Sequence, residues 1–249
     1  MSLQQTDFLS QVKKQYRYKL KVNCPFFSTL IAAQILAVVF SYAYGVSTSS
    51  GSMEGISYTL KHISGNIILI FTCMWALVIG ITFAGSSFRT DFCFVTNRLS
   101  SHLSSIALLA AAAVLAGTTA TLGSVFLRDL VYFTQHHAGT AVGFWIAPRD
   151  MLTAVTAASL YAFLLLSAGY FFGITAQRNR IFIILIPGLL VGMLLVQLNQ
   201  NSSVTFAQRF IDFICNETSL PLFTVKILAV SAVLYLLTML ISNRMEVEQ

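Results

Sequence analysis

The chain has 249 residues, of which 56% are hydrophobic and only 10% are charged, and its net charge is +6. A soluble domain carries about 25% charged residues, so a chain of this composition could not cover its own surface in water. The basic residues lie in short segments beside apolar runs, which favours a membrane over nucleic acid as the surroundings of the positive charge.

The apolar residues come in blocks that are as long as a bilayer is thick. A spanning helix needs about 20 mostly apolar residues, whereas a membrane strand would show alternation over about 10. The blocks are unbroken, so we expect helices, which satisfy their backbone groups internally. The predicted fold is an all-α polytopic membrane protein with one transmembrane domain over residues 1–249. Its six spans are predicted at about 25–44, 65–83, 103–126, 151–172, 181–198 and 221–242.

Residues 5–22, ahead of the first span, predict an amphipathic helix that lies in the membrane interface. Its apolar stripe is Leu9, Val12, Tyr16 and Leu20, and its flanking cations are Lys13, Arg17 and Lys21. Such a helix keeps its apolar face in the membrane and its cations near lipid phosphates. The alternative is a positive tail that only fixes the orientation of the chain.

Two connections follow along the chain. Residues 46–64 are rich in Ser and Gly and predict a loop. Residues 84–102 are too polar to span and predict a short amphipathic helix at the cytoplasmic surface. Its apolar positions are Phe88, Phe92 and Val95, at helical spacing, and its charged positions are Arg89, Asp91 and Arg98. This segment is either a plain connector or a docking element for a cytoplasmic partner.

Residues 127–150 predict an outer loop that holds the best candidate for an enzyme centre. It contains His136 and His137, followed by Arg149 and Asp150. Adjacent histidines on a helix point about 100° apart and bind one metal poorly, and HExxH spacing is absent. No GxSxG sequence occurs. We therefore expect a polar outer loop with neither a catalytic nor a metal site.

Residues 203–215, before the last span, predict a short outer helix that dips into the leaflet. Phe206, Phe210 and Phe213 give this segment an amphipathic pattern. An ordinary loop with a hydrophobic patch is the alternative. Within the spans, the pairs Gly169/Gly173 and Gly188/Gly192 favour close helix packing inside a bundle, although GxxxG spacing is a weak signal.

The source of energy is predicted from what the sequence lacks. No Asp or Glu falls in the middle of a predicted span, although proton-coupled carriers usually keep an ionisable residue there. No lysine follows a glycine, so no Walker A loop is present. The chain is predicted not to be an enzyme, and uphill transport would need energy from a separate subunit.

The distribution of Lys and Arg predicts the orientation. With the N-terminus in the cytoplasm, 10 of the 15 Lys and Arg residues fall on the inner side. This bias, with an even number of spans, predicts that both termini are cytoplasmic.

Taken together, these features resemble the permease subunit of an ABC transporter of the ABC-2 type. That family combines a basic amphipathic N-terminal helix, six spans, a coupling helix between spans 2 and 3, and a partly buried outer segment between spans 5 and 6. The sequence from residue 86 looks like the family's coupling loop and reads SSFRTDFCFVTNRLSSHLSSIALL.

The resemblance implies a bacterial six-helix half-permease in the cytoplasmic membrane. Phe88 to Arg98 would contact a cytoplasmic ATPase subunit, which would hold the ATP and Mg. The permease would pair with a second copy or a sibling and export an amphiphilic, peptide, drug or lipid-like substrate. The competing hypothesis is a non-ABC membrane protein, either an enzyme on lipid-like substrates or a structural partner of a membrane complex.

Overall fold

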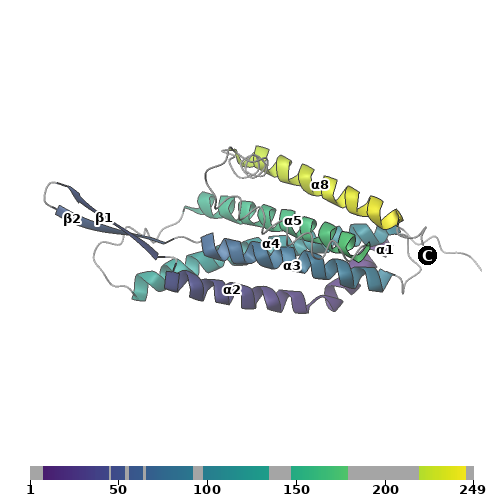
Figure 1. The fold of residues 1–249 in the computed structure, drawn as a ribbon, viewed down its shortest axis with the longest axis horizontal. Coiled ribbons are helices and arrows are strands. Elements are labelled where there is room, and N and C mark those ends of the chain that lie inside the picture. The colour runs from purple at the N-terminus through teal and green to yellow at the C-terminus, as the bar shows by residue number, and fades with distance from the viewer. Residues whose placement is uncertain are drawn as a thin grey trace, which may run out of the picture.

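The computed structural model describes residues 8–44, 46–53, 56–63, 66–91, 98–134, 147–178 and 219–244. Over these residues the chain forms six helices and one β-hairpin (Figure 1). The elements are α1 (Phe8–Val22), α2 (Pro25–Tyr44), β1 (Val46–Met53), β2 (Ile56–Ile63), α3 (Asn66–Asp91), α4 (Arg98–Thr134), α5 (Pro148–Arg178) and α8 (Leu220–Arg244).

Five of these helices, α2, α3, α4, α5 and α8, are long and apolar enough to cross a membrane. The chain is therefore a multi-pass membrane protein, and the predicted helical class is confirmed. The five helices coincide with five of the six predicted spans. The remaining prediction, a span at 181–198, lies outside the described residues.

The helix α4 is longer than predicted, with 37 residues. At about 1.5 Å per residue it measures about 55 Å, well beyond the roughly 30 Å of a hydrocarbon core. Residues 127–134 belong to this helix, so the predicted loop over 127–150 is wrong at its start. The reason is packing: Leu127 and Val131, one turn apart, are fully buried against α2 and α3, while Arg128 between them is exposed.

Residues 46–63 form an antiparallel hairpin where the sequence predicted a loop. The register pairs Val46 with Ile63 and Met53 with Ile56, without a bulge. Figure 1 shows the hairpin extending from the end of the bundle opposite to α1. The Ser/Gly content of β1 hid this element, because strand preference depends strongly on the neighbouring strand.

The helices α3 and α5 run parallel in the most extensive helix–helix contact among the described residues. A Cβ added to Gly80 would lie 2.5 Å from the Leu166 carbonyl oxygen, and one added to Gly173 would lie 2.5 Å from the Ala84 Cβ. Small residues let helix backbones approach this closely in lipid. The predicted role of Gly169 and Gly173 in packing the bundle is therefore confirmed, with α3 as their partner.

The helix α8 also runs parallel to α5. Phe223 contacts Tyr161 with ring centroids 5.0 Å apart, and further along both helices Tyr235 contacts Tyr170 at 6.1 Å. The opposite face of α8 carries exposed apolar side chains, among them Leu236 at 62%. An apolar face without protein cover is expected on a helix that faces lipid.

Candidate functional site: the polar seam between α1 and α4

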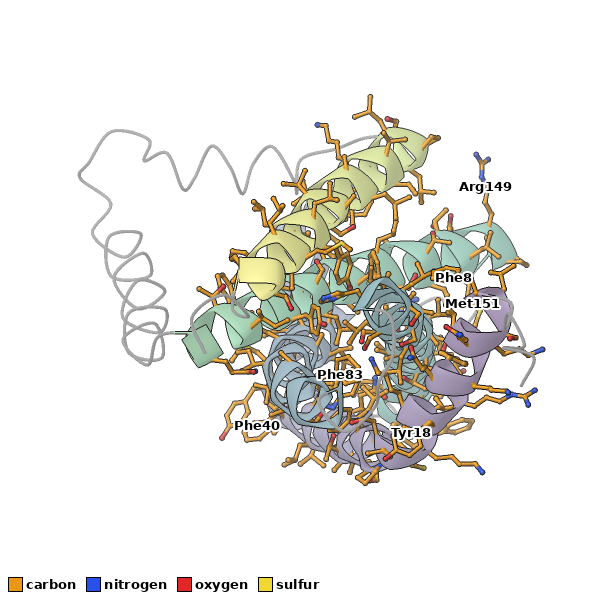
Figure 2. The ribbon with its side chains drawn as sticks, turned by 90° about the vertical axis from the view of Figure 1, so that its right-hand side faces the viewer. Phe8, Tyr18, Phe40, Phe83, Arg149 and Met151 are labelled. Atoms are coloured by element: carbon orange, nitrogen blue, oxygen red, sulfur yellow. The ribbon has the colours of Figure 1, made fainter. Side chains whose placement is uncertain are left out.

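The most polar buried contact in the described part of the chain lies where α1 crosses the start of α4. Figure 1 places α1 at the same end of the bundle as the C-terminal ends of α3, α5 and α8. Viewed along the bundle, Phe8 and Tyr18 of α1 lie at its side, while Phe83 of α3 lies near its centre (Figure 2). We call this contact the α1–α4 seam.

Lys19 is the centre of the seam and is only 5% exposed. Its ammonium group donates to the Ser101 carbonyl oxygen at 3.0 Å, to the Ser101 Oγ at 2.8 Å and to the Ser105 Oγ at 2.7 Å. An ammonium group has three protons to donate, so it can serve all three acceptors at once. Such bonds offset part of the unfavourable free energy of burying a charge.

The residues around Lys19 explain why the seam is polar on both sides. Gln15 on α1 stands one turn before Lys19, and Asn23, just past the end of α1, stands one turn after it and is 6% exposed. On α4, Ser101 and Ser105 accept from Lys19, and the neighbouring Ser100 and Ser104 are also buried. The seam therefore joins a polar stripe of α1 to a serine-rich stretch of α4.

Asn23 fixes the turn between α1 and α2. Its backbone amide and its Nδ2 both donate to the Lys19 carbonyl oxygen, at 3.0 and 2.8 Å, which caps the end of α1. Its own carbonyl oxygen accepts from the Phe26 amide at 3.0 Å in the first turn of α2. Lys19 is thus tied to α4 through its side chain and to α2 through its backbone.

The residues predicted for the interfacial helix take different positions on α1. Tyr16 and Leu20 pack partly buried against the main core, Val12 is half-buried, and Leu9 is 74% exposed. The cations Lys13, Arg17 and Lys21 are exposed. Part of the apolar stripe therefore contacts protein. Lys19 was not singled out from the sequence, although the i, i+4 spacing of Gln15, Lys19 and Asn23 was a signal for a separate polar face.

The residues predicted to contact a partner lie at the ends of two helices. Phe88, Arg89 and Asp91 fall in the last turns of α3, and Arg98 is the first residue of α4. Phe92 and Val95 lie outside the described residues. Up to Asp91 this segment continues α3 and does not begin a helix of its own. It stands at the same end of the bundle as the α1–α4 seam (Figure 1).

A second group of polar side chains crosses the bundle near the seam. The Tyr170 hydroxyl lies 3.5 Å from the Nδ1 of His102, which follows Ser101 on α4. The Tyr170 ring also contacts Phe83 at 5.9 Å and Tyr235 at 6.1 Å. The Tyr235 hydroxyl is buried and has no hydrogen-bond partner among the described residues. These rings link α3, α5 and α8 at one level.

Gln34 of α2 makes a further polar contact in the described interior of the bundle. Gln34 is 8% exposed and donates from its Nε2 to the Thr119 Oγ1 at 2.9 Å and, more weakly, to the Ala116 carbonyl oxygen at 3.4 Å. The Thr72 Oγ1 lies 3.5 Å from the same nitrogen. This contact joins α2 to α3 and α4 with neutral groups.

Acidic residues stay away from the middle of every described helix. Asp91 ends α3, Asp150 lies in the first turn of α5, and Asp129 is close to the end of α4. No group of three or more His, Cys, Asp or Glu side chains in the described part of the chain could hold a metal ion.

Of the remaining residues singled out in the sequence, two lie in the described part of the chain and the others lie outside it. Arg149 and Asp150 begin α5 and are exposed, and Arg149 points away from the bundle (Figure 2). His136 and His137 lie outside the described residues, as do Phe206, Phe210 and Phe213.

Comparisons with models of known families, with curated proteins and with solved structures give no match for this chain.

Proposed function

We propose that this chain is the permease subunit of an ABC transporter of the ABC-2 type in a bacterial cytoplasmic membrane. It would form the substrate pathway as a homodimer or with a sibling permease. A separate cytoplasmic ATPase subunit, holding ATP and Mg, would power it. The observation that supports this proposal best is the gathering of α1, the end of α3 and the start of α4 at one end of the bundle. Together these elements offer a partner a helical surface outside the membrane.

The proposed number of crossings is six. The helices α5 and α8 are parallel, so the chain leaves α5 at one end of the bundle and enters α8 at the other. An odd number of crossings between them satisfies this geometry, and the sequence predicts one, over 181–198. The helix α1 carries five Lys and Arg residues, which favour the cytoplasmic side of a membrane. The proposed orientation therefore places α1 and both termini in the cytoplasm.

An external source of energy fits the neutral interior formed by the described parts of α2, α3 and α4. The buried polar groups of α2, α3 and α4 are amide and hydroxyl groups, such as those of Gln34, Thr72 and Thr119. A carrier driven by protons needs a group that binds and releases them within the membrane. A neutral, largely apolar pathway suits amphiphilic, peptide, drug or lipid-like substrates, which we propose as the exported class.

The first experiment is to purify the tagged full chain from its native membrane in mild detergent. We expect an ATPase with Walker motifs to co-purify and its turnover to rise when the permease is present. The variants Arg89→Glu and Phe92→Pro should weaken binding of the ATPase or abolish the stimulation of its turnover while the chain still folds. Arg149→Glu is the matched control, because Arg149 is exposed at the other end of the bundle. Transport by the chain alone, with no ATPase present, would contradict the proposal.

The competing function is an enzyme acting on lipid-like substrates, centred on the histidine pair. Under that hypothesis, alanine at His136 and His137 would abolish activity, because general acid–base or metal chemistry needs these side chains. Under the permease proposal, transport and ATPase stimulation should change little in the same double variant.

A further inference from the structure

Lys19 carries its charge in a buried position, where a charge is unfavourable in free energy. It is almost fully buried, and burial of an ammonium group is unfavourable unless its hydrogen bonds are complete. A helix that only needed to lie on the membrane could carry an apolar residue at this position and pack equally well. The hydrogen bonds of Lys19 to Ser101 and Ser105 therefore call for an explanation other than stability.

We infer that Lys19 is a positioning residue that fastens α1 to the start of α4, so that α1 and the end of the bundle beside it move as one body. This inference rests on the proposed function for what drives the movement, which is the ATPase subunit. The fastening itself is independent of that partner.

The geometry of the Lys19 hydrogen bonds determines which movements of α1 relative to α4 they oppose. The two serines stand one turn apart on α4, and Lys19 bonds to both, which opposes sliding of α1 along α4 as well as separation from it. The Lys19 carbonyl oxygen accepts from Asn23, whose own carbonyl oxygen accepts from the Phe26 amide in the first turn of α2. A displacement at α1 or at the α3–α4 connection would therefore reach α2 and α4 together.

Stability and positioning predict different results for Lys19→Met, which keeps the length of the side chain and removes the charge. Replacing buried charged groups by apolar groups of similar shape is often neutral or favourable for stability when no charged partner is left behind, and the hydrogen-bond partners described above, Ser101 and Ser105, are uncharged. We therefore expect the unfolding temperature of Lys19→Met to be unchanged or higher. The motion of α1 relative to α4 should increase nevertheless, because the three hydrogen bonds are gone.

The first test is hydrogen–deuterium exchange on the full chain in lipid nanodiscs. In Lys19→Met, peptides from α1 and from residues 98–108 should exchange faster, by about tenfold if the seam opens locally, with α5 and α8 unchanged. Lys13→Met is the matched control, because Lys13 is an exposed lysine on the same helix. Unchanged exchange in α1 would overturn the inference.

A second variant addresses the serine side of the seam. Ser105→Ala removes one acceptor and should raise exchange in the same two regions by a smaller factor. In the double variant with Lys19→Met, the serine change should add almost nothing, because the two groups act through one contact. If the two changes raise the exchange rates independently and additively, Lys19 and Ser105 do not act through the same contact.

The third test uses the complex with the co-purified ATPase. Lys19→Met should bind the ATPase as the wild type does, but it should stimulate the turnover of the ATPase far less. Lys19→Arg should stimulate ATPase turnover more than Lys19→Met and less than the wild type. If Lys19→Met stimulates ATPase turnover normally although its α1 exchanges hydrogen faster, then Lys19 has no role in transmitting movement between the ATPase and the bundle. If no ATPase binds the wild-type chain, the proposed function fails, and the exchange experiment still decides whether Lys19 fastens the seam.

Discussion

At the residue scale, the described polar side chains show how hydroxyl groups are accommodated in an apolar helix bundle. Most short hydroxyls donate to a carbonyl of their own helix, as Thr72 does to Ile68 at 2.8 Å and Ser231 to Leu228 at 3.0 Å. A tyrosine hydroxyl stands too far from its own backbone for this solution. Tyr170 lies within reach of His102, whereas the hydroxyl of Tyr235 is buried without a partner in the described part of the chain.

The first prediction concerns Tyr235→Phe. An unsatisfied buried hydroxyl costs about 1–3 kcal/mol, so removing it should leave the unfolding free energy unchanged or raise it by about 1 kcal/mol. Thermal unfolding of the purified chain in one detergent measures the change. Tyr170→Phe is the control and should lower stability, because it removes a hydroxyl that has a partner. Equal losses in both variants would show that Tyr235 has a partner beyond the described residues.

At the scale of the elements, the parallel pair α3 and α5 forms the centre of the bundle. Its contact depends on glycines that face each other across the two helices, Gly80 on α3 and Gly169 on α5. A Cβ on Gly80 would meet backbone atoms of α5 and not the flexible end of a side chain. The helices would have to separate to admit it, which would also disturb the neighbouring contacts of Phe83 with Tyr170.

The second prediction follows from that contact. Gly80→Ala and Gly169→Ala should each destabilise the chain by about 1–3 kcal/mol, as overpacking of a tight contact does. The change is measured as a lower unfolding temperature, or as loss of the folded peak in size-exclusion chromatography. Gly85→Ala on α3 is the control, since its Cβ would meet only the Gln177 side chain, at 3.9 Å. A loss of stability in Gly85→Ala as large as in Gly80→Ala would refute this account.

At the scale of the whole molecule, the direction of the helices determines which ends share a side of the membrane. The helices α3, α5 and α8 point toward α1, while α2 and α4 point toward the end with the hairpin. The parallel order of α5 and α8 places Gln177 and Ser219 at opposite ends of the bundle, although only residues 178–218 separate them in sequence.

The third prediction tests this arrangement by labelling single cysteines in a cysteine-free background. Cysteines at Lys14 and Gln177 should react with a membrane-impermeant maleimide only after the cells are permeabilised. Cysteines at Thr134 and Ser219 should react in intact cells, because they stand at the other end of the bundle. All four positions are exposed. Labelling of Gln177 and Ser219 from the same side would contradict an odd number of crossings between them.

The sequence by itself determined that the chain is a membrane protein and where five of its helices lie. Length and hydrophobicity of a span are local properties, because each residue meets the same apolar surroundings whatever its neighbours are. For the same reason α2 begins and ends within a residue of its predicted bounds, and α8 starts one residue before its predicted start and ends two residues after its predicted end.

Only the tertiary structure decided which side chains of those helices face each other. The extension of α4 past Phe126 depends on the burial of Leu127 and Val131 against other helices, and the hairpin depends on the pairing of two strands. Lys19 is the clearest case. Its spacing from Gln15 and Asn23 marks a polar face, but its burial depends on serines that stand 82 and 86 positions further along the chain. Contacts between distant segments depend on how the helices pack together, and no local pattern carries that information.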